Sequence, residues 1–260
     1  MNIVTWNVNS VNVRLPNILK YLRDYKPDVL CLQELKCSDD KYPIDEFTSA
    51  GYNTIQACQK TYNGVSIISK TQATDSAINP VYVTQDEMRS IAATYNGVRV
   101  INFYVVNGQS VGSEKYQHKL NWLKKAQKYV KEQLKLYPDL VVVGDFNIVP
   151  NESDSFDFSS SNILCSDAER DALRDIINLG LNDCFSVEEG CSPFTWWDYR
   201  AGAFHRDLGY RIDLLLASAS LHTKLTNYTV HRDTRHKSWC EEQPKTSDHA
   251  PVMISVKKTI

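Results

Sequence analysis

Carboxylate and amide side chains recur directly beside short apolar runs of the chain. The groups that follow or precede such runs are Asn7, Asn9, Gln33, Glu34, Asp145, Asn147, Asp213, Asp248 and His249. Oxygen ligands without neighbouring cysteines are the type that a hard divalent cation such as Mg²⁺ or Mn²⁺ prefers. Glu34 and Asp248 are therefore candidate ligands for such an ion.

A histidine beside one of these carboxylates extends the chemistry. His249 follows Asp248, and a histidine at such a site can carry a proton or place a cation against a phosphoryl oxygen. With a divalent ion, these groups suit phosphodiester hydrolysis, in which the protein positions a water molecule and neutralises charge on the phosphorus centre. Each polar residue alone also fits an ordinary turn. The strongest single signal begins at Gly144, which allows a tight exit, and places Asp145 and Asn147 on one side of the chain.

The apolar runs that would carry these groups have the length and β-branched content of strands. They are bounded by Gly, Pro, Asn or Asp, which commonly terminate strands. The predicted strands are Ile3–Trp6, Val29–Leu32, Val65–Ile68, Ile91–Tyr95, Val98–Val106, Leu140–Val143, Ile212–Leu216 and Val252–Val256. Some alternate with helical segments, but several follow one another between residues 61 and 106, which predicts a mixed α/β protein with more than one sheet.

Three segments have the apolar spacing of amphipathic helices, over residues 15–22, 118–137 and 167–179. The second of them carries lysines on one face, which we interpret as a solvated face, with DNA contact as the alternative. These lysines are Lys119, Lys124, Lys125, Lys128, Lys131 and Lys135. The polar, unpatterned segments 151–162 and 231–245 are predicted to be flexible surface segments.

The composition is that of a globular protein. Of 260 residues, 29 are Lys or Arg and 31 are Asp or Glu, which gives a formal net charge of −2. This excludes a polybasic, histone-like protein but leaves room for a local basic face. Hydrophobic residues make up 42% and charged residues 23% of the chain, which argues against disorder. Because no Pro- or Ser-rich linker is present, we expect residues 1–260 to form one domain.

The sequence gives no indication of a membrane or of secretion. No apolar run approaches the about 20 residues that a membrane-spanning helix needs, and the N-terminal residues lead into a predicted strand rather than a secretory signal. We interpret the seven scattered cysteines as free thiols, because none forms a C-x-x-C pair. They are Cys31, Cys37, Cys58, Cys165, Cys184, Cys191 and Cys240. We therefore expect a cytoplasmic protein.

Seven short motifs, spread along nearly the whole chain, are shared with one known family. They are Trp6-Asn7-Val8-Asn9-Ser10, Leu32-Gln33-Glu34-Leu35-Lys36, Tyr62-Asn63-Gly64-Val65, Gly144-Asp145-Phe146-Asn147-Ile148-Val149-Pro150, Thr195-Trp196-Trp197-Asp198-Tyr199-Arg200, Arg211-Ile212-Asp213-Leu214-Leu215-Leu216-Ala217-Ser218 and Ser247-Asp248-His249-Ala250-Pro251-Val252. On these motifs the chain resembles the exonuclease III family of apurinic/apyrimidinic (AP) endonucleases, within the endonuclease/exonuclease/phosphatase superfamily. Gly-Asp-x-Asn and Ser-Asp-His occur across that superfamily, whereas Gln-Glu-x-Lys, Trp-Trp-Asp-Tyr-Arg and Arg-Ile-Asp resemble its DNA-repair branch.

The resemblance implies the fold and the metal site. The implied fold is a four-layer α/β sandwich, with two packed mixed β-sheets flanked by helices. Glu34 would bind Mg²⁺, with Mn²⁺ as an alternative, and Asp145 would orient or deprotonate the attacking water while Asn147 holds it and the phosphate. The full set of predicted metal-site residues is Asn7, Glu34, Asp145, Asn147, Asp248 and His249.

Further catalytic roles come from the same resemblance. His249 would contact the scissile phosphate, with Asp213 behind it, because a carboxylate fixes the tautomer of an imidazole and favours its cation. The family's tyrosine falls on Tyr104, whose phenol would donate to a phosphate oxygen or help to protonate the leaving group. The chain departs from the family pattern at Val106, where the family has proline. Because Asn107 remains, we expect that loop to keep its course with less rigidity.

The implied substrate contacts form a second group. Trp196, Tyr210 and Ile212 would line a pocket for the extruded abasic sugar, which costs little to flip because no base pair is broken at the lesion. Arg200 and Arg211 are predicted to pair with backbone phosphates, with surface solvation as the alternative, and such pairs would make binding salt-dependent. The predicted substrate-binding residues are Asn107, Trp196, Tyr210, Ile212, Arg200 and Arg211.

The resemblance implies a Mg²⁺-dependent DNA-repair nuclease that acts as a monomer. It would cut the phosphodiester 5′ of abasic sites in duplex DNA, and its site would also serve 3′-phosphatase and 3′-to-5′ exonuclease activity on 3′-blocked ends. One alternative is a phosphatase or phosphodiesterase for lipid headgroups, which the Gln-Glu-x-Lys segment and the missing membrane-binding element disfavour. The other is a binding module without catalysis, which should have lost a polar position, whereas every predicted one is present.

Overall fold

Two six-stranded sheets lie face to face in the computed structural model, which describes residues 1–186 and 192–257. In spatial order the first sheet contains β13 (Leu225–Val230), β14 (Val252–Val256), β1 (Asn2–Asn7), β2 (Val29–Gln33), β4 (Val65–Ser69) and β3 (Asn53–Ala57). The second contains β5 (Ser76–Ile78), β6 (Ser90–Tyr95), β7 (Val98–Tyr104), β8 (Leu140–Asp145), β12 (Asp213–Ser218) and β9 (Leu181–Asp183). A separate two-stranded ribbon consists of β10 (Trp196–Trp197) and β11 (Gly209–Tyr210).

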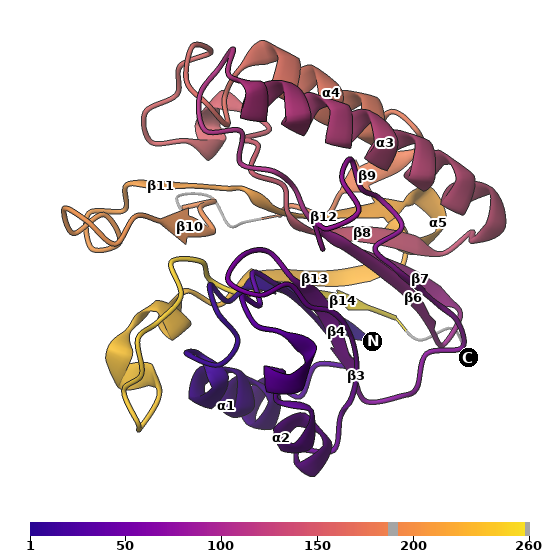
Figure 1. Ribbon diagram of the computed structural model, residues 1–260, viewed down its shortest axis with the longest axis vertical. Coiled ribbons are helices and arrows are strands. Elements are labelled where there is room, and N and C mark those ends of the chain that lie inside the picture. Colours follow the sequence, from indigo (N-terminus) through magenta and orange to yellow (C-terminus); the bar gives the residue numbers. More distant parts are fainter. Residues whose placement is uncertain (187–191, 258–260) are drawn as a thin grey trace.

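Helices cover the outer faces of both sheets (Figure 1). The first sheet is covered by α1 (Leu15–Tyr25) and α2 (Ile44–Ser49), and the second by α3 (Glu114–Leu136) and α4 (Asp167–Ile177). The remaining helical turns are α5 (Ala219–His222), η1 (Asp39–Lys41), η2 (Glu152–Asp154), η3 (Arg232–Arg235) and η4 (Lys237–Trp239). This arrangement confirms the predicted four-layer α/β sandwich.

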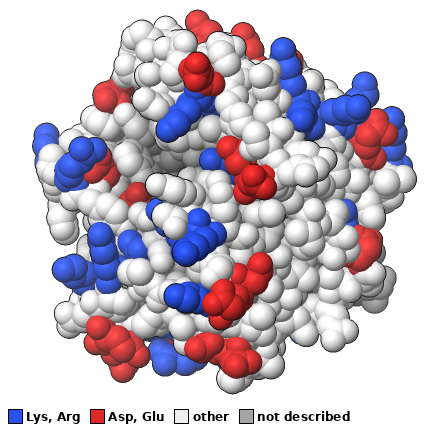
Figure 2. All heavy atoms as spheres, viewed as in Figure 1, with Lys and Arg blue, Asp and Glu red and all other residues white. Residues whose placement is uncertain are grey.

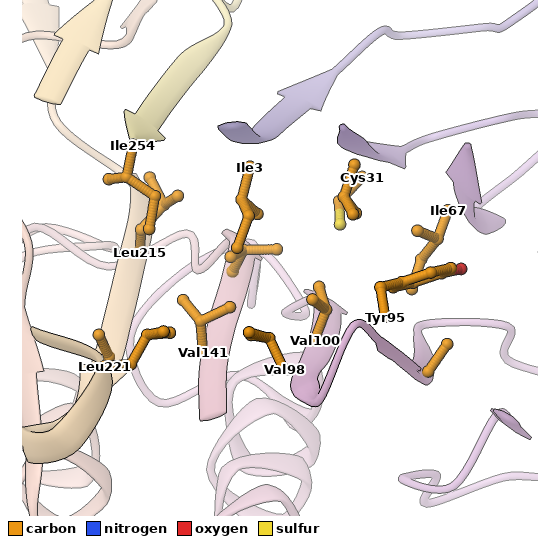
Figure 3. Close-up of a cluster of buried hydrophobic side chains, with 14 of the residues drawn as sticks. Ile3, Cys31, Ile67, Tyr95, Val98, Val100, Val141, Leu215, Leu221 and Ile254 are labelled. Carbon is orange, nitrogen blue, oxygen red and sulfur yellow. The ribbon is translucent and has the colours of Figure 1, made fainter. Parts of the chain in front are cut away.

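The layer between the sheets is apolar. Ile3 and Cys31 point from the first sheet toward Val100 and Val141 of the second (Figure 3), and all four side chains are fully buried. Two further apolar clusters lie outside the sheets, beneath α1 and beneath α3. Because the central strands are buried on both faces, they consist of nearly continuous apolar runs, and this is the signal from which the sequence predicts them.

One polar contact crosses the apolar layer. Gln33 Nε2 donates to Oδ1 of Asn102 at 2.7 Å, and Asn102 Nδ2 donates to the carbonyl oxygens of Leu32 (2.9 Å) and Ser66 (3.0 Å). Both amide side chains are fully buried. Buried amides are stable only when they are hydrogen-bonded, so this contact favours one register of the two sheets. Gln33, one of the two residues in this contact, immediately precedes Glu34 in the chain.

The predicted elements agree with the structure in the central layers and differ at the edges. All eight predicted strands are present, with boundaries shifted by two residues or fewer, and each of the three predicted helices is present. The sequence misses α2 and several short or outer strands. β3 and β13 lie at the sheet edge and keep partly exposed, polar residues, so they lack the apolar run of a central strand.

Lys119 contradicts the predicted solvated lysine face. The helix begins at Glu114, four residues before the predicted start at His118, and Ser113 caps it by accepting from the backbone N–H of Tyr116. Lys119 lies three residues after Tyr116 and four before Leu123, so it shares their buried face and is fully buried, whereas the other five lysines of the predicted face are exposed.

Three other expectations can be compared with the described residues. The polar segments 151–162 and 231–245 contain helical turns and bury Asp154 and Arg235, so they are more ordered than predicted. Six cysteines are free thiols, and Cys191 lies outside the described residues. Among the described helices, none combines the length and apolar character needed to cross a membrane.

His231, which follows β13, makes the fold sensitive to acid. Its Nδ1 lies 2.7 Å from the hydroxyl of Tyr21, and burial lowers its pKa to about 4. The unfolded chain takes up this proton below about pH 6.5, so the free energy of unfolding falls as the pH drops from about 6.5 toward 4. The loss at pH 4.5 is about 2–3 kcal/mol.

We expect His231→Gln, which can still accept from Tyr21, to remove this part of the pH dependence. Urea unfolding at pH 7.5 and pH 4.5 measures it. His205→Gln, at an exposed histidine, serves as the control and should keep the wild-type pH dependence. An unchanged difference between the two pH values in His231→Gln would contradict the assignment.

Candidate active site

The predicted chemical groups meet at one end of the sandwich, where strand ends of the two sheets come together. In the first sheet, β1 and β2 are parallel neighbours; Asn7 ends β1, and Glu34 follows β2 with a φ of 57°. In the second sheet, the parallel strands β7 and β8 place Tyr104 beside Asp145. Asp213, the first residue of β12, pairs with Asp145 from the other side. The site therefore contains residues from both sheets.

Asn7 joins the two halves of the site. Its Nδ2 donates to Oε1 of Glu34 at 2.8 Å and to Oδ2 of Asp145 at 2.9 Å. The Tyr104 hydroxyl donates to the same Oε1 of Glu34 at 2.9 Å, and Lys36 Nζ lies 2.7 Å from the other oxygen, Oε2. Three side chains, those of Asn7, Lys36 and Tyr104, thus converge on the Glu34 carboxylate.

His249 and Asp213 form a buried pair beside this group. Nδ1 of His249 lies 2.9 Å from Oδ2 of Asp213, and Nε2 lies 3.8 Å from Oδ2 of Asp145. Burial opposes protonation of His249, but Asp213 and Asp145 outweigh it and raise the pKa of the imidazole to about 10. The ring is therefore a cation near neutral pH, with Nδ1–H donating to Asp213 and Nε2–H directed into the site.

The two carboxylates of the site have pKa values shifted in opposite directions. Burial raises the pKa of Asp145 to about 7, although His249 works against this shift. Burial also acts on Glu34, but Lys36 and Asn7 outweigh it and hold the pKa of Glu34 below its usual value. Neighbouring groups whose pKa values are moved apart are typical of sites that carry out acid–base chemistry.

One group of side chains fits a divalent cation. Glu34, Asp145 and His249 each bring one oxygen or nitrogen atom within 4.8 Å of the others. His249 can bind a metal only after losing a proton, so the two carboxylates are the ligands available near neutral pH. Carboxylate oxygens beside an amide, with no cysteine in the group, are the donors that Mg²⁺ and Mn²⁺ accept. Asp248 is not part of this group, because its oxygens accept hydrogen bonds from Asn9 (3.1 Å) and from the Trp196 indole (3.1 Å).

The exit from β8 holds Asn147 in place. Gly144 has a φ of 142°, and a Cβ there would lie 1.9 Å from the carbonyl oxygen of Phe103, so only glycine fits. Asn147 follows with a φ of 49°, and its N–H donates to Oδ1 of Asp145 at 2.9 Å. Its side-chain oxygen accepts from Nδ2 of Asn107 at 3.0 Å. Asn107 itself is exposed, so this bonded pair leads from the buried Asp145 to the surface.

An aromatic stack lies next to the carboxylates. The rings of Trp196 and Tyr210 are 5.4 Å apart and nearly parallel, at 11°, and Phe156 stacks on the other side of Tyr210 at 5.4 Å. The Tyr210 hydroxyl donates to Asp157 at 2.7 Å. Ile212 is buried, in a cluster on which Trp196 and Tyr210 pack. A backbone bridge pairs Trp196 with His249, which fixes the stack relative to the site.

The two predicted arginine contacts have different surroundings. The side chain of Arg211 is 1% exposed, and its guanidinium binds Asp154 with two bonds of 2.9 Å and Asp183 with one of 2.8 Å. It therefore points into the protein, and this burial is at odds with the predicted phosphate contact. Arg200 has a side chain that is 88% exposed beside Asp198, so only this arginine of the two is accessible to a nucleic acid.

Several neighbours of the site are absent from the predicted set. Asn9 and Lys36 lie within quoted motifs, so their sequence signal was available. Arg89, whose guanidinium lies 4.9 Å from the centre of the Tyr104 ring, has no such signal. Phe156 and Asp157 belong to the segment 151–162 that the sequence presents as unpatterned, and only the fold brings them to Tyr210.

The chain is similar over its whole length to proteins of known structure. A 3′ phosphatase, NExo, from Neisseria, bound to a product DNA hairpin, is 39% identical with a TM-score of 0.92, covering 99% of this chain and 100% of that chain. An AP endonuclease from Archaeoglobus fulgidus is 33% identical with a TM-score of 0.90 over the same shares. An exodeoxyribonuclease of Bacillus subtilis is 29% identical over 98% of this chain and 99% of its own length.

Residues 4–249 also match the sequence family described as the Endonuclease/Exonuclease/phosphatase family. The match begins in β1 and ends at His249, so it contains the entire group of converging carboxylates and the histidine. This shared sequence, together with the fold and the site at the meeting strand ends, places the chain in the endonuclease/exonuclease/phosphatase family.

Proposed function

We propose that the protein is a divalent-metal-dependent DNA-repair nuclease that hydrolyses the phosphodiester 5′ of abasic sites in duplex DNA and removes 3′-blocking groups. The observation that carries the proposal is the convergence of Glu34, Asp145 and His249 within 4.8 Å, beside the stacked ring of Trp196. The names of the relatives, which include exodeoxyribonuclease, AP endonuclease and 3′ phosphatase, support it.

The metal would be held by the carboxylates of Glu34 and Asp145, which Asn7 orients through its Nδ2. When bound, Mg²⁺ or Mn²⁺ would neutralise the negative charge that a phosphodiester develops during hydrolysis. Asp248 would act one contact farther away, through Asn9 and the Trp196 indole. Lys36 already provides one positive charge on the outer oxygen of Glu34.

Side chains of the protein carry out the proton transfers. Asp145 accepts a proton from the attacking water, a role for which a pKa of about 7 is suited. His249 donates from Nε2 to a phosphoryl oxygen, while Asp213 holds Nδ1 and keeps the imidazole cationic. Asn147 orients the water and the phosphate, and the Tyr104 hydroxyl is directed toward the same centre.

The substrate contacts combine an aromatic wall with few surface charges. Trp196, Tyr210 and Ile212 would hold the extruded sugar, and Asn107 and Arg200 would contact the backbone. Lys and Arg are interspersed with Asp and Glu over the face in Figure 2, and the net charge is −2. We therefore expect local contacts, rather than one continuous basic patch on this face, to provide the affinity for DNA. A 3′-terminal phosphate presents the same bond to the same site. The expected setting is a monomer in the cytoplasm.

Cleavage of three matched DNA substrates tests the proposed function. They are a duplex with one abasic analogue, a nicked duplex with a 3′-phosphate and an intact duplex, each with Mg²⁺ and with a chelator. We expect cleavage of the first two only with metal. Equal cleavage of intact and abasic duplex would exclude lesion specificity. Phosphate release from phosphoinositide vesicles, with none from DNA, would establish the lipid-headgroup alternative.

Trp196→Ala should weaken the abasic-site reaction selectively. Packing of the extruded sugar against the apolar face of the indole contributes about 1–3 kcal/mol, so we expect KM for the abasic duplex to rise by about 5- to 150-fold. Trp196→Phe keeps a ring but loses the bond from the indole to Asp248, and it should retain most of the affinity. Steady-state kinetics measure both variants. Equal losses in the two variants would assign the effect to the indole N–H instead of the ring.

A further inference from the structure

A fully buried ion pair lies directly beneath the Asn147 segment. Lys119 of α3 and Glu169 of α4 are in contact, and both side chains are 0% exposed. Nζ of Lys119 also donates to the carbonyl oxygen of Asn147 at 2.6 Å and to that of Asn107 at 3.1 Å. An ammonium group has three N–H donors, so all three of them have acceptors here. Two of these acceptors belong to residues with proposed roles in the reaction.

Glu169 connects this ammonium group to a third segment. Its Oε2 accepts from the N–H and the hydroxyl of Ser166 at 3.2 and 2.6 Å, and its Oε1 accepts from the N–H of Leu164 at 3.2 Å. The carbonyl oxygen of Leu164 in turn accepts from the N–H of Val149 at 2.8 Å. Leu164 and Val149 both belong to the buried cluster that supports the aromatic stack.

The neighbouring backbone is shaped to admit the lysine. Gly108 has a φ of 95°, and a Cβ at this position would lie 3.2 Å from Cδ of Lys119 and 3.0 Å from Cδ1 of Ile163. A side chain here would therefore strain the backbone and crowd both neighbours. The loop after β7 passes close to Lys119 because it has glycine at this point, and this close approach brings the Asn107 carbonyl within reach.

We propose that Lys119 is a positioning residue of the nuclease reaction. It fixes the carbonyls of Asn107 and Asn147 and, through Glu169, locks them to the segment beneath the aromatic stack. Asn147 has a φ of 49°, a conformation that asparagine tolerates but does not prefer, and the bond from Lys119 to its carbonyl stabilises it there. Its N–H also holds Asp145, so a shift of this segment disturbs the group that activates water. The inference rests on the proposed function of Asn147 and Asp145.

If Lys119 had only a structural role, removing the charges of Lys119 and Glu169 together should leave turnover unchanged in a variant that folds. Replacing Lys119 alone leaves a buried carboxylate without a partner, whereas replacing both members of a buried ion pair with apolar residues of similar volume is often neutral for stability. In Lys119→Met/Glu169→Met the core is filled, but the two carbonyls lose their donor, and Ser166 and Leu164 lose their acceptor. Lys119→Gln/Glu169→Gln, a neutral hydrogen-bonding pair, provides a second test if the first variant does not fold.

Kinetics on the abasic duplex separate the two roles. For either neutral pair we expect kcat to fall by about 10- to 100-fold, as displacement of a catalytic group by about 1 Å would cause. KM and the affinity for DNA in Ca²⁺ should change by less than kcat, at most about fivefold, because Lys119 touches no substrate and only the Asn107 contact is loosened. Lys119→Arg keeps the positive charge and should recover most of the lost turnover. A neutral pair that folds and turns over within twofold of the wild type overturns the proposal.

Hydrogen exchange separates failure of this inference from failure of the proposed function. If the wild type shows no activity on DNA, the proposed function fails, but the ordering role of Lys119 can still be measured. Amides in residues 145–149 and 162–166 should exchange faster in the neutral pairs, while those of β6 and β7 keep wild-type rates. Unchanged exchange in both segments overturns the inference whatever the activity.

Discussion

Replacement of Asp145 with asparagine is expected to lower turnover on the abasic duplex by about 10²- to 10⁴-fold. Asparagine has the same shape, but its single side-chain oxygen can accept from only one of Asn7 and Asn147, which bond to the two separate oxygens of Asp145 at 2.9 Å each. It cannot accept a proton from water, and it brings no charge to a divalent ion. Single-turnover kinetics with saturating enzyme measure the chemical step directly and separate this loss from changes in DNA binding.

The same variant should be at least as stable as the wild type. Burial raises the pKa of Asp145 above that of an unfolded aspartate, so its ionised form destabilises the fold near neutral pH. Asparagine removes that cost, and thermal unfolding should show an equal or higher Tm. Asp171→Asn, at an exposed carboxylate on α4, is the matched control with normal turnover. Retention of more than a tenth of the activity in Asp145→Asn would rule out its role as the base.

Arg211→Met is expected to destabilise the protein by about 3–5 kcal/mol, because it leaves the buried carboxylate of Asp154 without its cation. The side chains of Arg211 and Asp154 are only 1% and 2% exposed, so solvent does not compensate for the loss. The contact also joins the η2 turn to the start of β12, where Asp213 lies. Urea unfolding at neutral pH measures the free-energy change.

An exposed arginine provides the control for Arg211. Arg200→Met removes an ion pair with Asp198 on the surface, and such pairs contribute about 0–1 kcal/mol. For DNA binding we expect Arg200 to matter more than Arg211. Loss of Arg200 should reduce the salt dependence of binding, and loss of Arg211 should leave it unchanged. A reduced salt dependence in Arg211→Met, with little loss of stability, would restore the phosphate contact predicted from the sequence.

The sequence predicts the central layers and the polar strand ends because both depend on local patterns. A strand buried on two faces must be apolar along its length. A polar side chain at the end of such a strand lies where the apolar layer stops. The grouping of Glu34 with Asp145 follows from such ends and from the family motifs. Edge strands such as β3 and β13 lack this pattern, since one side of each borders solvent.

The surroundings of individual charges could not be predicted in the same way. The spacing of Lys119 from Leu123 puts it on the apolar face of α3, but its partner Glu169, which allows a buried charge there, lies 50 residues away in the chain. Arg211 has the composition of a DNA contact, but its partners Asp154 and Asp183 are 57 and 28 residues away. Only tertiary structure reveals such partners, and they decide whether a basic side chain binds substrate or supports the core.

The hydrogen bonds of Gln33 and Asn102 between the sheets have a consequence for assembly. If the two layers docked one residue out of register, the Asn102 amide would be buried without its partners Leu32, Ser66 and Gln33, at a cost of about 1–3 kcal/mol for each orphaned group. Gln33 would keep its bonds to Thr5 and Cys31 of its own sheet. The same slip would separate Asn7 from Asp145 and dismantle the reaction centre. Misdocked forms of the chain are thus both penalised and inert, so that competence for DNA cleavage arises only when the sandwich closes in its native alignment.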